Sequence, residues 1–334
     1  MLRRRLFATL ALAGLAVSIL LTAPAVAANR CAPGFHCESN SYGYRIADAG
    51  VEYSSPRGEF TVGNDYGIAA EHARLGGGRG SLGYPTSTLR QDNYLHKGFY
   101  QIFERGVIYT RGTEGIAVKG GASPFDATHR AAGGGAGLAL GYPVAREVRE
   151  ASGYWYQRFE NGVIYVSPRG AHAVPGSTDL TYFYGRDSGH GAAVERTSLN
   201  DTHRSNGGGS GILGYPSGRA TSQGGPYLYQ VFERGVLYCG ARNARNDTYG
   251  CWPVVGALSQ VHRSYGGGSG IGYPIAAREL ITWATCESGA PYWQQAYERG
   301  HIITFASGRY SVLDYRGSGE HYPSFPEDCD AGNS

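Results

Sequence analysis

The sequence predicts an all-β protein with short helices, in which five β-hairpin units form a pseudo-symmetric, propeller-like closed ring. One observation is a tetrapeptide, Leu-Gly-Tyr-Pro, that occurs four times, with isoleucine replacing leucine in the last copy. A tyrosine-rich hairpin follows each copy, and a further hairpin lies near the N-terminus. Repetition over this length indicates a repeat architecture. The tetrapeptides are Leu82, Gly83, Tyr84, Pro85; Leu140, Gly141, Tyr142, Pro143; Leu213, Gly214, Tyr215, Pro216; and Ile271, Gly272, Tyr273, Pro274.

A short helix is expected before each tetrapeptide. In the second copy, residues 125–132 are compatible with a helix, and Asp126 lies near the expected N-cap. The three glycines 133–135 would end this helix, because glycine accepts the positive φ of a helix C-terminus. Proline fixes φ and disfavours a helical residue before it, so the tetrapeptide should be extended or form a turn.

Two strands should follow the tetrapeptide. In the second copy they flank Asn161-Gly162, which is a strong hairpin-turn signal, and the corresponding pairs are Arg105-Gly106, Arg234-Gly235 and Arg299-Gly300. A two-residue turn here would pair Phe103 with Ile108 and Glu104 with Val107. With the related segment from Tyr44, the hairpin units lie near residues 44–62, 100–119, 156–174, 229–254 and 294–313, with an insertion at about 179–196.

The C-terminal tail, 315–334, contains a degenerate tetrapeptide around Tyr322-Pro323. The first hairpin has no tetrapeptide before it. We therefore expect the tail to supply the missing element and to close the ring, which would also remove open sheet edges. A chance Tyr-Pro in the tail is the alternative.

Residues 1–27 have the pattern of a secretory signal peptide: three arginines, an apolar run and a small-residue cleavage site at Ala25-Val26-Ala27. The mature chain, 28–334, should then be a single exported repeat domain, extracellular or cell-wall associated. No later stretch has the roughly 20 apolar residues that a membrane span needs. The net charge of +3 lies entirely in the signal segment, which carries three arginines and no acid (3 − 3 = 0). A near-neutral mature chain gives no electrostatic support for nucleic-acid or membrane partners.

Six cysteines in an exported chain predict three disulfides. Proximity along the sequence suggests Cys31–Cys37 and Cys239–Cys251, which leaves Cys286–Cys329, and other pairings remain open.

Together with the tetrapeptide, the hairpin pattern Tyr-Gln-x-Phe-Glu-x-Gly-x-Ile-Tyr and the segment Ser-Pro-Arg-Gly-Ala-His-Ala-Val at 167–174 resemble the LGFP repeat. Proteins with this repeat are exported actinobacterial cell-wall proteins, often carrying a mycolyltransferase or amidase. The resemblance covers about Tyr44 to Asp314, and it implies a five-fold propeller-like ring that tethers its carrier to the envelope polysaccharide. Tyrosine replaces the family's phenylalanine in every tetrapeptide, and histidine stands where the family usually has tryptophan.

Alternation along each hairpin places tyrosine, glutamate and tyrosine on one face, opposite an apolar face. Such a face suits sugars, because aromatic rings cover C–H surfaces while carboxylates accept hydrogen bonds from hydroxyl groups. The alternative is that the tyrosines pack between units and that glutamate binds backbone or arginine. The carbohydrate-binding candidates are Tyr100, Glu104, Tyr109, Tyr156, Glu160, Tyr165, Tyr229, Glu233 and Tyr238.

Four histidines occupy one structural position in different units: His72, His129, His203 and His262. They are weak candidates for a metal site, and a structural role is the favoured interpretation. The glycine runs lack the Gly-Lys-Ser/Thr of a phosphate-binding loop. No catalytic residues are identified, so neither an enzymatic activity nor a cofactor is predicted.

The sequence therefore predicts a secreted envelope-binding protein whose partner is cell-wall polysaccharide, bound at several weak sites that gain avidity on a polymer. One alternative is a propeller-type glycan hydrolase, which would need an acid pair that does not recur between units. Another is an interaction or inhibitor module for an exported envelope enzyme, acting through the insertion and the loop closed by Cys239–Cys251.

Overall fold

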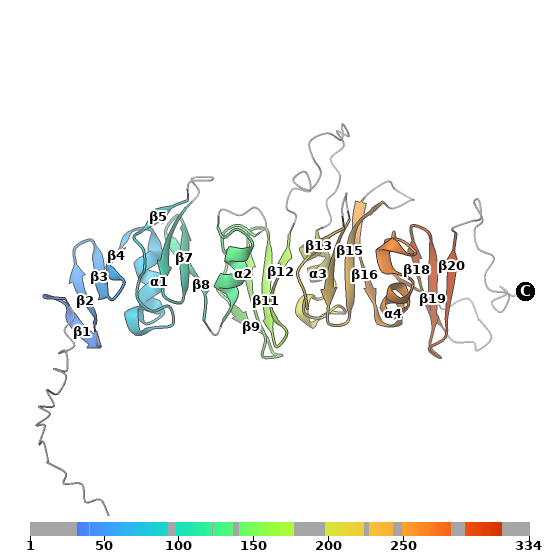
Figure 1. Ribbon diagram of the computed structural model, residues 1–334, viewed down its shortest axis with the longest axis horizontal. Coiled ribbons are helices and arrows are strands. Elements are labelled where there is room, and N and C mark those ends of the chain that lie inside the picture. The colour runs from blue at the N-terminus through green and yellow to red at the C-terminus, as the bar shows by residue number, and fades with distance from the viewer. Residues whose placement is uncertain are drawn as a thin grey trace, which may run out of the picture.

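The computed structural model describes residues 32–39, 41–92, 98–121, 123–135, 140–176, 198–223, 227–242, 249–281 and 291–315. The expected signal peptide, the insertion at 179–196 and all of the tail except Tyr315 lie outside these ranges. The described residues form five four-stranded sheets and a few short helices (Figure 1). The expectation of an all-β protein with short helices is confirmed.

Each sheet is an antiparallel meander whose strands pair in chain order. The first contains β1 (His36–Ser39), β2 (Tyr42–Ala47), β3 (Gly50–Ser55) and β4 (Gly58–Gly63). The second contains β5 (Arg90–Gln91), β6 (Phe99–Phe103), β7 (Gly106–Arg111) and β8 (Glu114–Lys119). The third contains β9 (Val148–Arg149), β10 (Trp155–Phe159), β11 (Gly162–Ser167) and β12 (Gly170–Pro175). The fourth contains β13 (Thr221–Ser222), β14 (Leu228–Phe232), β15 (Gly235–Arg242) and β16 (Tyr249–Val255). The fifth contains β17 (Glu279–Ile281), β18 (Tyr292–Tyr297), β19 (Gly300–Phe305) and β20 (Tyr310–Asp314).

A short helix lies between each sheet and the next (Figure 1). These helices are α1 (Ile68–Arg74), α2 (Phe125–Ala131), α3 (Leu199–Ser205) and α4 (Gly256–Ser264). Single 3-10 turns accompany them at η1 (Asp65–Gly67), η2 (Gly77–Arg79), η4 (Gly208–Ser210) and η5 (Gly267–Ser269). Asp126 lies within the first turn of α2, whose N-cap position is Pro124. In α3 the cap is Ser198, whose hydroxyl accepts a hydrogen bond from the Asp201 amide.

The tetrapeptide belongs to the sheet that follows it. Pro143 forms an isolated antiparallel bridge with Phe159, and the other three prolines do the same with their own hairpins. The glycine of every tetrapeptide has a positive φ, between 71° and 98°, which explains why glycine is needed there.

The hairpin turn lies one residue earlier than the sequence predicts. Glu104 and Arg105 form the turn, so Phe103 pairs with Gly106 and Ile102 with Val107. The expected pairing of Phe103 with Ile108 is therefore wrong, as is that of Glu104 with Val107. The tetrapeptide causes the difference, because its Tyr84 and Leu82 carbonyls accept hydrogen bonds from the amides of Glu104 and Arg105.

Apolar residues are buried at the four boundaries between sheets. At the second boundary, Val107, Tyr109 and Val118 of one sheet contact Phe125 of α2 and Leu140 of the tetrapeptide, and then Phe159 and Ile164 of the next sheet. Three similar clusters occupy the other boundaries. Each internal sheet therefore buries both faces.

The five sheets follow one another in a row, with β1–β4 and β17–β20 at opposite ends (Figure 1). The closed ring expected from the sequence is not found among the described residues. Equivalent boundaries place each unit on its neighbour in a similar way. The rotation between neighbouring units then decides whether a repeat array closes into a ring or extends as a row. The sequence gives the number of units but not that rotation.

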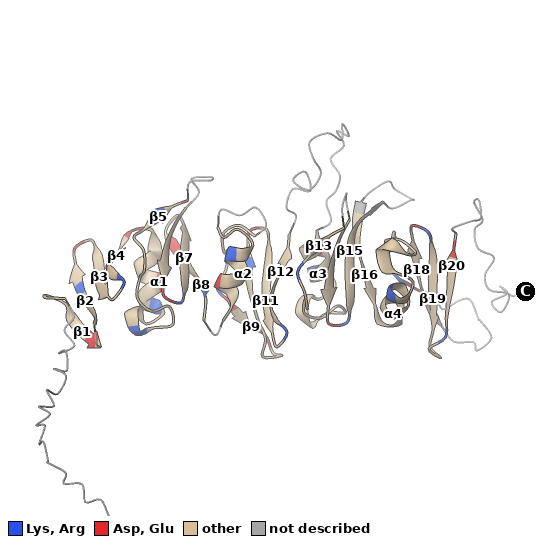
Figure 2. Ribbon diagram, in the orientation of Figure 1, with Lys and Arg blue, Asp and Glu red and all other residues tan. Residues whose placement is uncertain are grey.

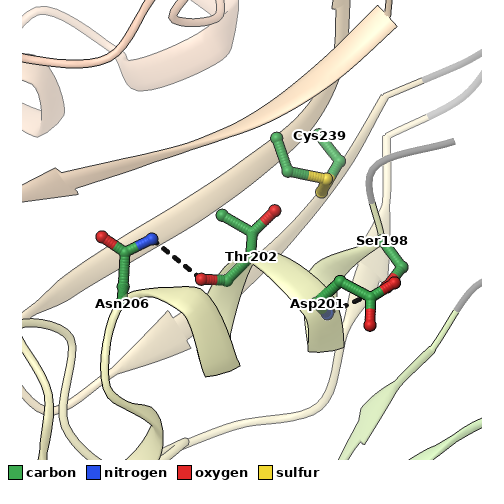
Figure 3. Close-up of a disulfide and its surroundings, with 6 residues drawn as sticks. Ser198, Asp201, Thr202, Asn206 and Cys239 are labelled. Carbon is green, nitrogen blue, oxygen red and sulfur yellow. Dashed lines mark hydrogen bonds between the residues drawn. A yellow bond between two sulfur atoms is a disulfide. The ribbon is translucent and has the colours of Figure 1, made fainter. Parts of the chain in front are cut away.

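Cys239 and Cys251 form the expected disulfide across the paired strands β15 and β16. This bridge lies beside α3, close to Thr202 (Figure 3). Cys37 is also disulfide-bonded. Cys31, Cys286 and Cys329, which the other two predicted bridges involve, lie outside the described residues. None of the helices in the described part of the chain is long and apolar enough to cross a bilayer.

Candidate functional site

The four histidines lie at four separate boundaries, where each binds a tetrapeptide. His129 is fully buried, and its Nε2 lies 2.8 Å from the carbonyl oxygen of Gly141. Its ring stacks on Phe159 at 4.6 Å and meets the edge of Tyr109 at 5.1 Å. The contacts of the other three are equivalent: His72 with Gly83, His203 with Gly214 and His262 with Gly272.

Burial lowers the pKa of all four imidazoles, to about 4 for His129. A neutral imidazole that donates from Nε2 to a carbonyl fits this environment. Within the described ranges, no group of three or more histidine, cysteine or acidic residues could hold a metal ion. The structure thus assigns these histidines to packing between units.

The candidate glutamates bind the tetrapeptide backbone. Glu104 accepts a hydrogen bond from the Tyr84 amide at 3.2 Å, and Glu160 accepts one from the Tyr142 amide at 3.1 Å. Glu233 and Glu298 make the same bond to Tyr215 and Tyr273. Each carboxylate therefore holds a turn.

A fully buried glutamine joins neighbouring sheets at every boundary. The side-chain amide of Gln157 donates to the carbonyl oxygen of Ala117 in the preceding sheet at 2.8 Å, and to that of Ala145 at 3.1 Å. Gln101, Gln230 and Gln295 make corresponding pairs of bonds. The sequence signal for this role is the recurrence of glutamine at one position in all four hairpins.

The hydroxyl of each tetrapeptide tyrosine has an acceptor in the preceding sheet. Tyr142 donates to Asp92 at 2.8 Å in a buried contact. Tyr84 donates to Glu38 within β1, whereas Tyr215 donates to Glu150 and Tyr273 to Gln223, which like Asp92 directly follow the first strand of a sheet. These partners explain why tyrosine can replace phenylalanine, since a buried hydroxyl needs an acceptor. Sequence reasoning missed them, because they lie in or directly after first strands of only two to four residues.

The two tyrosines of each candidate hairpin differ in exposure. Tyr109, Tyr165 and Tyr238 are buried, with no more than 6% of their surface exposed, and each meets a histidine edge-on. Burial raises the pKa of all three, to about 12 for Tyr238, so they remain protonated. Tyr100, Tyr156 and Tyr229 are only half-buried, and they face these partners at about 6 Å between ring centroids.

Further half-buried tyrosines lie two residues before this half-buried tyrosine of the second strand, at Tyr42, Tyr154 and Tyr227. The Tyr42 hydroxyl donates to Glu104 at 3.2 Å, and that of Tyr227 donates to Glu298 at 2.8 Å. Each of these tyrosines thus reaches a glutamate of the next unit. We call the half-buried set Tyr42, Tyr44, Tyr100, Tyr154, Tyr156, Tyr227 and Tyr229 the tyrosine rim.

Charged residues of both signs are interspersed along the described part of the row (Figure 2). This distribution agrees with the near-neutral charge of the sequence from residue 28 onward.

A cavity of about 370 Å³ lies between the β10–β11 turn and α3. Its lining includes Glu160, one of the predicted sugar-binding residues, together with Arg158, Asn200, Asp201 and Arg204. This volume falls within the range of small-molecule sites.

Comparison with known proteins gives one family match. The model of the LGFP repeat matches residues 140–183, which begin at the second tetrapeptide. No curated protein matches the chain.

Two solved structures show only distant similarity. The extracellular domain of a one-component system from B. thetaiotaomicron is 9% identical with a TM-score of 0.15, and the alignment covers 86% of this chain and 31% of that one. A catalytically inactive virginiamycin B lyase from Staphylococcus aureus, solved with quinupristin, is 8% identical with a TM-score of 0.12, over 83% of this chain and 72% of that one.

Proposed function

We propose that this chain, whose residues 140–183 match the LGFP repeat, is an exported protein that binds the cell envelope by multivalent contact with wall polysaccharide. Export rests on the signal-peptide pattern of residues 1–27. The partner class rests on the kind of protein in which this repeat is found and on the residues of the tyrosine rim.

The observation that carries the proposal is the recurrence of the tyrosine rim. Tyr44, Tyr100, Tyr156 and Tyr229 occupy one position in four successive units, and all four remain half-buried. Most other recurrent polar groups of the unit are engaged within the protein. The rim therefore supplies repeated aromatic surface beside glutamate carboxylates, which suits the alternating C–H faces and hydroxyl groups of a sugar chain.

A polymer is favoured over a free sugar as the ligand of the rim. Each rim position offers one or two partly exposed rings, so a single contact would be weak. Several such contacts on one polysaccharide chain act together, because each later contact forms at high effective concentration.

Retention on purified wall polysaccharide tests the proposal. The triple variant Tyr100→Ala/Tyr156→Ala/Tyr229→Ala should lose retention by more than any single variant. Tyr310→Ala is the matched control, because Tyr310 is 52% exposed on β20 and lies outside the rim. Thermal melting confirms that the variants fold. Equal retention of the triple variant and the control would contradict the role of the rim, and no retention of the natural protein on any wall fraction would contradict the function.

One observation favours a glycan hydrolase as the second candidate. Glu160 and Asp201 line the same cavity, and Asp201 has no acidic counterpart in the other helices. Both carboxylates already accept hydrogen bonds, from the Tyr142 amide and from the Ser198 hydroxyl. Release of reducing sugar from wall polysaccharide, abolished in Asp201→Asn, would establish the hydrolase.

A further inference from the structure

Four of the five sheets receive the unit that precedes them through the same kinds of side chain. In the second sheet these are Gln101, Phe103 and Ile108. The glutamine donates to the carbonyl oxygen of Thr61 in the first sheet, and the two apolar side chains are buried in the boundary cluster. A glutamate at the hairpin turn, Glu104, holds the tetrapeptide. The third, fourth and fifth sheets repeat this set with a glutamine, an aromatic residue, an aliphatic residue and a glutamate.

The first sheet carries none of these groups, and its outer face is polar. Strand pairing places Arg45, Ala47 and Glu52 where the second sheet has its glutamine, phenylalanine and isoleucine. Arg45 and Glu52 form an ion pair, and the Arg45 guanidinium lies over the Phe35 ring at 4.7 Å. An exposed Asp48 replaces the turn glutamate. A terminal unit with a polar outer face ends the stack of a repeat protein. The first sheet therefore caps the N-terminal end of the row, and its hairpin lacks the residues that a tetrapeptide binds.

The fifth sheet presents an apolar face at the other end of the row. Strand pairing places His301, Ile303 and Leu313 at the positions through which the second sheet contacts α2 and the tetrapeptide. Ile303 forms a cluster with Ile281 and Tyr292, against which Leu313 packs. All members of this cluster come from the fifth sheet, whereas each of the other four clusters includes residues of the following unit. Only 4% of Ile303 and 1% of Tyr292 is exposed. The face thus has the character of a boundary, although the described residues include no unit beyond it.

The chain leaves the fifth sheet as it leaves the second. The amide of Tyr315 donates to the carbonyl oxygen of Arg299 at 2.8 Å, just after β20. The same bond follows β8, where the Gly120 amide donates to Arg105 at 2.7 Å. After Gly120 the chain forms α2 and the tetrapeptide, which cover the face of the sheet that the chain has just left. The ring centroid of Tyr315 lies 5.9 Å from that of His301, on the equivalent face of the fifth sheet. The tail therefore starts along the path of a covering segment.

The tail also has the length and the side chains to cover this face. It contains 19 residues after Tyr315 (334 − 315 = 19). The shortest of the four covering segments starts from the same hydrogen bond at Gly256 and ends with its tetrapeptide at Pro274, which is 18 residues (274 − 256 = 18). Tyr322 and Phe325 give the tail two large aromatic side chains.

A second copy of the chain fits this face less well than the tail does. In a head-to-tail stack, the fifth sheet of one copy would pack on the first sheet of another, where the Arg45–Glu52 pair lies. Burying that pair against Ile303 and Leu313, which offer no polar partner, would be costly. Closure of the row into a ring would join the same two faces, so the same cost opposes it.

We propose that residues 316–334 fold back on the outer face of the fifth sheet, with Tyr322 and Phe325 packing on Ile303 and Leu313. The tail then takes the place that a helix and a tetrapeptide take at the four boundaries. The protein is an open row with a polar cap at one end and its own tail at the other. This inference is independent of the ligand of the tyrosine rim.

Photo-cross-linking of the mature chain, 28–334, tests the position of the tail. p-Benzoylphenylalanine replaces Phe325 in one protein and Tyr322 in a second, and the cross-linked peptides are identified by mass spectrometry after illumination. We expect intramolecular cross-links to residues 291–315 in both proteins. The same group at Tyr66, which is 40% exposed in η1, is the matched control and should give no cross-link to that region.

The products distinguish the possible occupants of the face. Cross-links from the tail to residues 32–63 would indicate closure onto the first sheet, and cross-links found only between two copies would indicate a dimer. Either result would overturn the inference, as would the absence of a cross-link from both positions.

A second measurement follows the apolar face itself. The double variant Tyr322→Ser/Phe325→Ser should uncover this face, so we expect a rise in the fluorescence of the dye ANS, which binds exposed apolar surface. Tyr310→Ser is the matched control, because Tyr310 is already 52% exposed on β20. Far-UV circular dichroism confirms that the sheets remain folded. Equal fluorescence of the double variant and the control would contradict the packing of the tail.

Discussion

Acidification should destabilise this protein through its buried histidines, and the pKa of His129 gives the magnitude of the loss in free energy of unfolding. The imidazole of His129 is fully buried between Tyr109 and Phe159, and Nε2 donates to the Gly141 carbonyl. Its Nδ1 has no hydrogen-bond partner in the structure. Protonation would therefore place a charge and an unpaired donor in an apolar boundary, which explains why burial lowers the pKa of His129 from 6.5 to about 4.

The sign of this change in stability follows from whether the folded or the unfolded chain binds the proton. Between pH 6.5 and 4 the unfolded chain takes up a proton at His129 that the folded chain does not, so the free energy of unfolding falls as the pH falls. Each pKa unit corresponds to about 1.4 kcal/mol, so this residue alone removes about 3 kcal/mol by pH 4. Burial lowers the pKa of the other three histidines too, so their contributions have the same sign.

Urea unfolding at several pH values between 7 and 4.5 measures this dependence. His129→Gln is the matched variant, because its amide can donate to the Gly141 carbonyl but does not titrate. Burial raises the pKa of Asp126 and Glu150, and their contributions oppose that of the histidines, so the comparison between variants isolates His129. We expect a smaller loss of stability on acidification in His129→Gln. Equal slopes for the two proteins, or an NMR titration of His129 near pH 6.5, would refute the reasoning.

Three further predictions concern the boundaries and the shape of the row. A Cβ at Gly78 would lie 2.8 Å from Cζ of Tyr84, so Gly78→Ala should lower the free energy of unfolding in urea by about 1–3 kcal/mol. As the control, Gly218→Ala has nothing within 4 Å of its Cβ and should change that free energy by less than about 0.5 kcal/mol. Equal effects of the two substitutions would contradict the packing argument. Gln157→Leu leaves the carbonyls of Ala117 and Ala145 without their donor and should cost about 2 kcal/mol in the same assay, whereas Gln294→Leu, at a half-buried residue whose bond to Glu279 is exposed, should cost little. Small-angle scattering of the mature chain should give a radius of gyration well above the roughly 19 Å of a compact protein of this length, and a value near 19 Å would support a compact closed form instead.

The sequence predicts the unit well because its signals are local. Glycine at positive φ in the tetrapeptide and the alternation of Gln101, Phe103 and Ile108 depend on neighbours within a few residues. The hairpin turn was displaced by one residue because a non-local partner, the tetrapeptide, competes for the Glu104 and Arg105 amides. The closed ring is not confirmed among the described residues, because the arrangement of units depends on small rotations at each boundary that local signals do not specify.

The candidate site was predicted only in part, because recurrence does not distinguish a ligand contact from a contact between units. Glu160 looks like a sugar ligand in the sequence, but its carboxylate binds the Tyr142 amide. Tyr165 looks like a stacking platform, but 95% of its surface is buried. Only the tyrosines of the rim, such as Tyr156, keep exposed surface.

The copies of a repeat therefore act as controls for one another. A residue that recurs, such as Gln157 among its counterparts, is explained by the boundary that every copy must form. A residue that departs from its counterparts without an evident structural gain needs another explanation. Asn200 is not such a departure, because the corresponding residues Ala69, Asp126 and Ser259 all differ from one another. A departure can be recognised only where the other copies agree, as they do at the turn arginines Arg105, Arg234 and Arg299.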